Sequence, residues 1–160
     1  MPRRTIRYSL GAKEYAFLLL KYRMRSEKEL YSRLKAKGFD EQEAKKVVAF
    51  LKEKNFIDDR SFTRSWIASR LSRPLGVRRI RLELFQKGKP ESLVNGELAR
   101  LKSGYCEEKV VEELAQERLG RLLKSDPIKA RNRTFAFLIR RGFSPEVVTD
   151  ILNKLCRQIF

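Results

Sequence analysis

The sequence predicts an all-α protein made of three tandem three-helix repeats, forming an elongated molecule whose curvature depends on the angles between repeats. Apolar residues recur at the three- and four-residue spacing of amphipathic helices along most of the chain. No stretch alternates apolar and polar residues at strand period for long enough to compete with this pattern. Glycines stand at matching points of three segments about fifty residues apart, which indicates an internal repeat.

Each of these glycines, Gly38, Gly88 and Gly142, follows an amphipathic segment and is predicted to close it as a helix C-cap. Glycine is favoured at that position because the cap takes a left-handed backbone conformation. A leucine precedes each glycine by four residues, at Leu34, Leu84 and Leu138. The helices are therefore expected to stop at equivalent points of the three repeats.

A further helix is predicted to begin just after each glycine. The start signals are Asp40 with Glu43, Pro90 with Glu91, and Ser144 with Pro145 and Glu146. The apolar sets that follow share a helical period: Ala44, Val47, Val48 and Leu51; Leu93, Val94 and Leu98; Val147, Val148, Ile151 and Leu152. Gly96 falls inside the second of these segments and predicts an irregular helix there.

A third helix is predicted ahead of each pair, at residues 12–22, 61–71 and 107–123. The expected organisation is a basic N-terminal arm over residues 1–11 followed by three repeats. These repeats are expected to cover residues 12–55, 56–104 and 105–160.

Charge is the strongest compositional feature of the chain. Lys and Arg total 37 against 20 Asp and Glu, which gives a formal net charge of +17 in 160 residues. The hydrophobic fraction of 42% is that of a folded protein, so a folded surface is expected to bind a polyanion. The apolar run 17–20 is too short to span a bilayer, and no secretory signal is recognised, so a cytoplasmic location without membrane contact is expected. Like-sign charge favours a monomer.

The sequence lacks most of the residue types and motifs that catalytic sites use. The chain has no His and two Cys, which favours two unpaired thiols and excludes the common base, nucleophile and zinc arrangements. No phosphate-cradling glycine motif is present. Asp58 and Asp59 could be imagined as a magnesium site, but capping of the helix that follows is favoured. No catalytic residue, metal or cofactor is therefore expected.

A concentrated basic segment runs from Arg60 to Lys89 and is opposed only by Glu83. Arginine side chains bind phosphate and carboxylate in a forked geometry, so nucleic acid and acidic protein both fit. The candidate binding residues of this segment are Arg70, Arg73, Arg78, Arg79, Arg81 and Lys87. Leu82 and Phe85 form a second apolar face on the helix predicted at 76–87, and packing against a neighbouring repeat is favoured over partner binding.

The helix predicted at 127–141 carries the second basic group. Its buried stripe is expected to contain Ile128, Phe135, Leu138 and Ile139. Phe137 points elsewhere, among four cations, and could stack on a base, although packing between repeats is favoured. The candidate binding residues here are Lys129, Arg133, Phe137, Arg140 and Arg141.

Two motifs resemble the core signature of the RecX regulatory proteins. They are I-D-D-x-x-F at residues 57–62 and G-x-x-R-I-x-x-E-L-x-x-K-G at residues 76–88, and the resemblance extends over residues 12–155. Lys89 departs from the apolar residue found after the other repeat glycines. The positions that match the signature are Asp58, Asp59, Phe62, Arg79, Ile80, Glu83, Leu84, Lys87 and Gly88, several of them with an expected structural role.

The resemblance implies tandem three-helix repeats and a partner, the RecA recombinase. RecX proteins bind RecA assembled on single-stranded DNA, lodge in the filament groove and restrain RecA recombination, ATPase and coprotease activities. The implied context is DNA repair, homologous recombination and the SOS response, with double-stranded DNA as a further DNA partner. The rival interpretations are an autonomous DNA-binding or architectural protein, suggested by the charge, and a nuclease-like enzyme, suggested only by Asp58 and Asp59.

Overall fold

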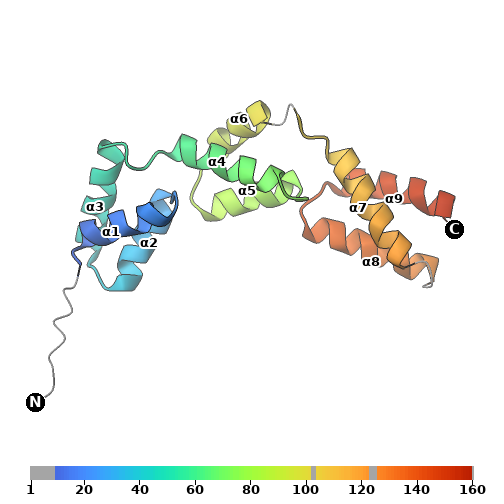
Figure 1. The fold of residues 1–160 in the computed structure, drawn as a ribbon, viewed down its shortest axis with the longest axis horizontal. Coiled ribbons are helices and arrows are strands. Elements are labelled where there is room, and N and C mark those ends of the chain that lie inside the picture. Colours follow the sequence, from blue (N-terminus) through green and yellow to red (C-terminus); the bar gives the residue numbers. More distant parts are fainter. Residues whose placement is uncertain (1–9, 102–103, 123–125, 160) are drawn as a thin grey trace, which may run out of the picture. The chain divides into compact units, whose positions relative to one another are not determined.

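The computed structural model describes residues 10–101, 104–122 and 126–159, and it confirms the all-α prediction (Figure 1). In these ranges the chain forms nine helices and no strand. The helices are α1 (Ala12–Tyr22), α2 (Glu27–Lys37), α3 (Glu41–Glu53), α4 (Asp59–Leu71), α5 (Val77–Gln86), α6 (Glu91–Leu101), α7 (Glu107–Arg121), α8 (Pro127–Arg140) and α9 (Pro145–Ile159). Within the described ranges, no helix has the length and apolar character needed to cross a membrane.

The three repeat glycines end their helices with the same hydrogen-bond pattern. Gly38, Gly88 and Gly142 have positive φ angles of 106°, 76° and 84°. In each case the amide after the glycine donates to the carbonyl of the leucine four residues before it: Phe39 to Leu34 at 3.2 Å, Lys89 to Leu84 at 3.0 Å, and Phe143 to Leu138 at 3.3 Å. This is the Schellman arrangement, so the predicted C-caps are confirmed in all three repeats.

Helix starts also follow the sequence signals. The Asp40 carboxylate accepts from the backbone N–H of Glu43 at 2.7 Å, and the Asp126 carboxylate accepts from that of Lys129 at 2.9 Å. Each bond satisfies an amide that has no partner within its own helix. The prediction of an irregular helix at Gly96 is wrong, because α6 continues through that residue to Leu101.

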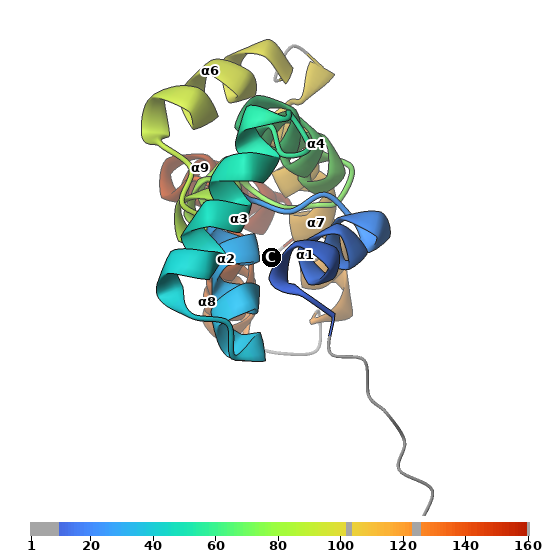
Figure 2. The same cartoon turned by 90° about the vertical axis from the view of Figure 1, so that its left-hand side faces the viewer.

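The described residues fall into two compact units that divide between Phe62 and Thr63, within α4. In the first unit α1, α2 and α3 pack together, and Figures 1 and 2 show α2 beside α3. Its core consists of Ala12, Ala16, Leu19, Leu30, Leu34, Ala44, Leu51 and Ile57. This division is coarser than three repeats, and the repeat boundaries stay a prediction.

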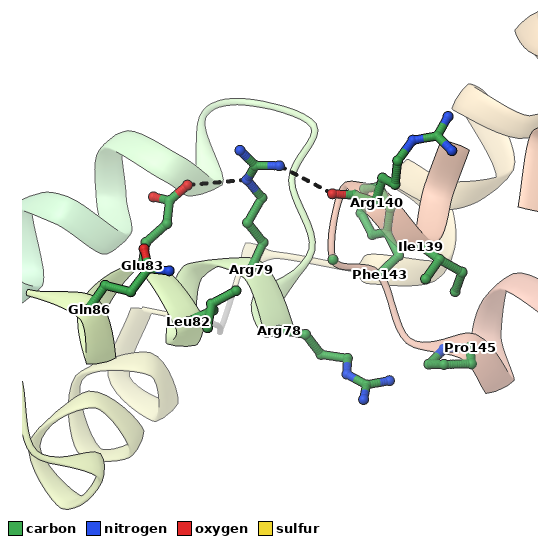
Figure 3. A pocket seen from close by; sticks show the side chains of 10 residues that line it. Arg78, Arg79, Leu82, Glu83, Gln86, Ile139, Arg140, Phe143 and Pro145 are labelled. Atoms are coloured by element: carbon green, nitrogen blue, oxygen red, sulfur yellow. Dashed lines mark hydrogen bonds and ion pairs between the residues drawn. The ribbon is translucent and has the colours of Figure 1, made fainter. Parts of the chain in front are cut away.

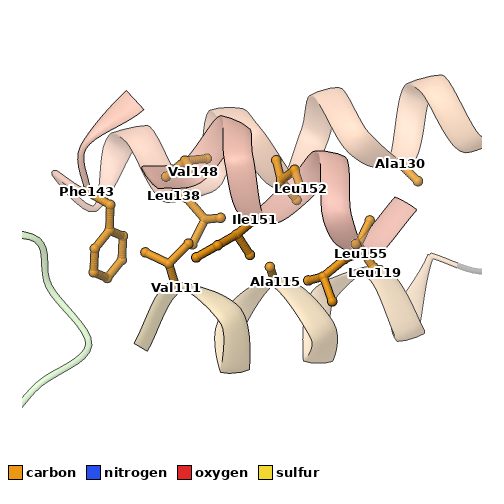
Figure 4. Packing of buried hydrophobic residues seen from close by; sticks show 10 residues of the cluster. All are labelled: Val111, Ala115, Leu119, Ala130, Leu138, Phe143, Val148, Ile151, Leu152 and Leu155. Carbon is orange, nitrogen blue, oxygen red and sulfur yellow. The ribbon is translucent and has the colours of Figure 1, made fainter. Parts of the chain in front are cut away.

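The second unit contains a tight bundle of α7, α8 and α9 (Figure 4). Its core consists of Val111, Ala115, Leu119, Ala130, Leu138, Phe143, Val148, Ile151, Leu152 and Leu155. Phe135 and Ile139 pack against this core as predicted. Ile128 does not, since 70% of its surface is exposed, so its place in the buried stripe was wrong. The cysteines of the described part are free thiols.

In α4, α5 and α6 an apolar core is combined with buried ionic contacts. Ile67, Val77, Ile80, Leu84, Val94 and Leu98 are buried. Glu97, only 2% exposed, accepts from Arg64 at 3.0 Å and so ties α6 to α4. Lys89 occupies the position that Phe143 takes in the next repeat and is 3% exposed, so a lysine side chain fills the place of an apolar one.

A backbone-to-backbone junction joins the start of α5 to the end of α8. The amide of Gly76 donates to the carbonyl of Arg141 at 2.9 Å, and the amide of Arg78 donates to the carbonyl of Gly142 at 3.2 Å. A Cβ atom on Gly76 would lie 2.0 Å from the Gly142 oxygen, and one on Gly142 would lie 2.4 Å from the Arg79 Cβ. Both positions therefore require glycine.

Side chains reinforce this junction from both directions. Arg79 Nη1 donates to the Arg140 carbonyl at 3.2 Å, and Arg141 Nη1 donates to the Pro74 carbonyl at 3.0 Å. The Tyr105 hydroxyl donates to the Leu75 carbonyl at 3.0 Å. The amide end of α5 thus meets the carbonyl end of α8, where the two helix dipoles attract each other.

The junction can be tested by adding one methyl group. We expect Gly76→Ala to lower stability by about 1–3 kcal/mol, because a Cβ atom there overlaps backbone that cannot move aside. Gly96→Ala is the matched control, since nothing lies within 4 Å of its added Cβ in the middle of α6, and it should gain about 1 kcal/mol. Thermal unfolding measured by circular dichroism reports both changes. Equal melting temperatures for Gly76→Ala and the wild type would contradict the contact.

Because the half-buried Tyr105 hydroxyl forms a hydrogen bond at the junction, the stability of the protein should fall at alkaline pH. Burial first, then nearby acidic groups, raise the pKa of Tyr105 to about 12 from an ordinary value of 10.0. Below pH 10 both folded and unfolded chains keep the proton, so the contribution is complete. Between pH 10 and 12 the unfolded chain loses its proton first, so stability falls as the pH rises.

We therefore expect urea unfolding at pH 9, 10 and 11 to show a steeper loss of stability in the wild type than in Tyr105→Phe. Tyr22→Phe, which removes the hydroxyl of a side chain that is 77% exposed, controls for general alkaline effects. Parallel slopes for the wild type and Tyr105→Phe would rule out this role of the hydroxyl.

Candidate functional site

An open groove lies beside the junction, between α5 and the loop that joins α8 to α9 (Figure 3). It encloses about 670 Å³. Its lining residues are Arg78, Arg79, Leu82, Glu83, Gln86, Ile139, Arg140, Gly142, Phe143 and Pro145. Three of these are arginines and one is a carboxylate, so the groove is basic. Figure 3 shows Arg79 between Glu83 and the Arg140 carbonyl, while Arg78 extends toward Pro145.

Glu83 organises the basic side chains of α4 and α5. One of its oxygens accepts from Arg70 Nε at 2.6 Å and from Trp66 Nε1 at 3.1 Å, and the other accepts from Arg79 Nε at 3.2 Å. Burial alone would raise the pKa of Glu83, but the hydrogen bonds from Arg70 and Arg79 outweigh it and lower the pKa below its usual value. Glu83 therefore stays ionised and holds these arginines in place.

The groove arginines differ in how they are held. Arg79 is fixed at both ends of its guanidinium, by Glu83 and by the Arg140 carbonyl. The side chains of Arg78 and Arg140 are exposed and form no hydrogen bond or ion pair with any part of the chain that the structure describes. Arg78 and Arg140 are therefore the groove cations that remain available to an anionic ligand.

The basic surface continues from the groove along α8. Residues four and seven positions apart share a face of a helix, so Lys129, Arg133 and Arg140 lie along one side of α8. All three are exposed. They span about 16 Å of helix, a length that suits an extended anion better than a single small one.

Other predicted binding residues are engaged within the chain. The Arg70 guanidinium lies 4.2 Å from the centre of the Trp66 ring, and the Lys87 ammonium lies 4.1 Å from it. Arg141 is held by the Pro74 carbonyl. These three cations stabilise the fold around the groove, whereas Arg73 and Arg81 are exposed outside its lining.

Phe137 lies beside Arg141, one of the four cations that the sequence placed around it, but its packing is neither of the two that the sequence suggested. Its ring packs against the core of the α7–α9 bundle. The guanidinium carbons of Arg118 and Arg141 lie 4.3 Å and 4.6 Å from the ring centre. The ring thus already has cationic partners from its own chain, and Arg118 comes from a helix that the pattern around Phe137 did not indicate.

Leu82 and Phe85 also differ from the favoured interpretation. They were expected to pack against a neighbouring repeat, but they are 56% and 74% exposed. A helical pattern shows that both residues share a face of α5, and it does not show whether another element covers that face.

Most of the signature residues have structural roles. Phe62, Ile80 and Leu84 are buried, and Gly88 takes the left-handed conformation after α5. The Asp58 carboxylate accepts from the amides of Arg60 and Ser61 at 2.9 Å and 3.2 Å. The hydrogen bond from the Ser61 side chain, followed by that from the Arg60 amide, lowers the pKa of Asp58. Asp58 is therefore a helix cap, and Asp59 is the first residue of α4.

Trp66 was missed in the sequence, and Gly76, the first residue of the second signature motif, was quoted there without the role that it has in the structure. Trp66 supports Arg70 and Lys87 and donates to Glu83. Gly76 permits the junction that forms one wall of the groove. A signal for Trp66 did exist, since it precedes Arg70 by one helical turn and so shares a face with it.

Three family models match the chain in the order of its helices. The model described as "RecX, first three-helix domain" matches residues 12–51, the second domain matches residues 58–95, and the third domain matches residues 107–152. Each match covers the first two helices of one predicted repeat and part of the third.

Proteins named "Regulatory protein RecX" are similar over most of this chain. The protein from Clostridium botulinum (strain Alaska E43 / Type E3) is 30% identical over 148 residues, covering 91% of this chain and 68% of its own. The protein from Chlorobaculum tepidum is 34% identical over 144 residues, covering 89% of this chain and 87% of its own.

Two crystal structures share the fold. That of RecX from Lactobacillus salivarius has a TM-score of 0.73 at 21% identity and covers 90% of this chain and 94% of its own. A second, titled as regulatory protein RecX, has a TM-score of 0.78 at 23% identity over 89% of this chain and 71% of its own. With three matching domain models and relatives at 30% identity or more, the chain belongs to the RecX family of regulatory proteins.

Proposed function

We propose that this protein binds RecA filaments assembled on single-stranded DNA and restrains RecA recombination, ATPase and coprotease activities. Membership of the RecX family indicates a regulatory role. The arginine groove and the basic face of α8 support the proposal that DNA is part of what the protein binds. The carrying observation is that the side chains of Arg78 and Arg140 line this groove, are exposed, and form no hydrogen bond or ion pair with the described residues. Guanidinium groups so placed suit the phosphates of a DNA backbone.

The action is proposed to be binding without bond chemistry. The Asp58 carboxylate, half of the pair suggested as a magnesium site, is occupied by backbone amides at the start of α4. The nuclease interpretation therefore has no observation in its favour. Magnesium-dependent cleavage of labelled DNA by the purified protein would support the nuclease interpretation.

An autonomous DNA-binding or architectural role is the second candidate, because the net charge of +17 also suits naked DNA. The two roles differ in their dependence on RecA. An autonomous binder holds naked DNA tightly, and a filament regulator prefers the assembled filament and inhibits RecA below one protein per RecA. A monomer in the cytoplasm, where RecA and chromosomal DNA meet, is part of the proposal.

The decisive measurement is the single-stranded-DNA-dependent ATPase of the cognate RecA. We expect Arg78→Glu/Arg140→Glu to inhibit this ATPase at least about tenfold less effectively than the wild type, because the change replaces two phosphate-binding cations with carboxylates. Arg33→Glu/Lys46→Glu is the matched control, since it makes the same charge change at exposed residues of α2 and α3.

Binding to a single-stranded oligonucleotide at several salt concentrations provides the second readout. Loss of two phosphate contacts should reduce the log–log salt slope by about 0.7 for each contact. Equal losses in the groove variant and the control variant would show that net charge alone governs binding. Unchanged ATPase inhibition by the groove variant would remove the groove from the proposal.

A further inference from the structure

The outer face of α5 carries a second, smaller cavity shared with α6. It encloses about 300 Å³. Its lining residues are Arg81, Leu82, Phe85, Lys89, Glu91 and Val94. Val94 is 4% exposed and forms part of the floor, whereas Leu82 and Phe85 stand at 56% and 74% exposure. The cavity therefore has an apolar interior with two large apolar side chains open to solvent.

Other large apolar side chains are exposed as well, among them Tyr22 at 77% and Phe56 at 54%, but Leu82 and Phe85 line one cavity together. Charged residues make up 36% of the sequence, and exposed apolar groups that border a pocket commonly mark an interaction site. Ile128 is similarly exposed, at 70%, but on α8. On α5 the exposed pair sits at i and i+3 on one side of the helix, so a single partner segment can contact both side chains.

The charges around the cavity restrict what can bind. Arg81 is exposed and forms no ion pair with the described residues, so its guanidinium is open to a carboxylate. Glu91 stands on the opposite element, at the first position of α6, and would repel a phosphate chain lying across the cavity. Of the two exposed apolar side chains only Phe85 offers a ring, so at most one base could stack here.

We propose that this α5–α6 cavity docks a protein segment that presents an apolar side chain next to a carboxylate. The apolar side chain enters between Leu82, Phe85 and Val94, and the carboxylate pairs with Arg81. The inference rests on the proposed function, because RecA is the protein expected to supply the segment. It assigns protein contact to this cavity and leaves DNA contact to the arginine groove.

The two surfaces adjoin each other through one residue. Leu82 lines both the groove and the cavity. A ligand composed of a nucleic acid with protein bound along it can therefore be contacted on both sides of α5 at once. Such a divided surface would favour the filament over either component alone, because the two contacts act together.

The test uses two single variants in the full chain, Phe85→Ser and Arg81→Glu, because Phe85 and Arg81 line the cavity and not the groove. Ile128→Ser is the matched control, since it removes an equally exposed apolar side chain from another helix. Circular dichroism and melting temperature establish that each variant is folded, as expected for exposed positions. Two affinities are then measured for each variant, one for DNA-free RecA and one for a single-stranded oligonucleotide.

We expect Phe85→Ser and Arg81→Glu each to bind DNA-free RecA at least about tenfold more weakly than the wild type. Oligonucleotide affinity of Phe85→Ser should remain within about twofold of the wild type, and Ile128→Ser should match the wild type in both assays. Loss of oligonucleotide affinity without loss of RecA affinity would identify Phe85 as a base-stacking residue and overturn the proposal.

Two further outcomes separate this inference from the proposed function. If wild-type protein binds RecA and both Phe85→Ser and Arg81→Glu bind equally well, the cavity is not the docking site, although the proposed function stands. If wild-type protein neither binds RecA nor inhibits its ATPase, the proposed function fails and this inference fails with it.

Discussion

The second unit depends on a contact between two backbones that leaves no room for a side chain. Gly76 and Gly142 approach each other so closely that a Cβ atom on either would overlap its neighbour. This proximity lets the first amides of α5 bond to the last carbonyls of α8. The contact fixes α5 and α8 beside each other as the two sides of one groove. It therefore also determines where Arg78 and Arg140 lie.

Charge alone would make this arrangement unfavourable, because the groove gathers several guanidinium groups. Glu83 offsets the repulsion by accepting from Arg70 and Arg79 together. Stacking of Arg70 and Lys87 on Trp66 places two further cations against an aromatic ring. Much of the positive charge near the groove therefore serves to hold the groove itself. Only part of the net charge of +17 remains available to a partner.

The local part of this fold could be predicted from the sequence. Aspartates before apolar periods and glycines after them determine where helices begin and end through bonds only a few residues long, and the structure contains these bonds. Contacts between distant residues could not be predicted in this way. The helical wheel placed Ile128 in a buried stripe and Leu82 and Phe85 under another repeat, yet exposure depends on which elements arrive from elsewhere.

The sequence predicted that the candidate site is rich in arginine, but it predicted only part of how these arginines are arranged. Arg78, Arg79 and Arg140 were recognised as basic residues, but their convergence requires the tertiary contact at Gly76, which nothing in the local pattern indicates. Arg70, Lys87 and Arg141 were identified by the same signal and turn out to be engaged within the chain. A list of basic residues does not separate cations that bind a ligand from cations that position others.

The indole beneath Arg70 and Lys87 has a consequence for how this protein can be studied. Trp66 is the single tryptophan of the chain, and its N–H donates to Glu83, the carboxylate that also holds Arg79 at the groove. Any ligand that draws Arg79 away from Glu83 changes the hydrogen bonding and the electric field at this one indole. The intrinsic fluorescence of Trp66 would thus report, without an added label, a ligand that displaces Arg79 from Glu83.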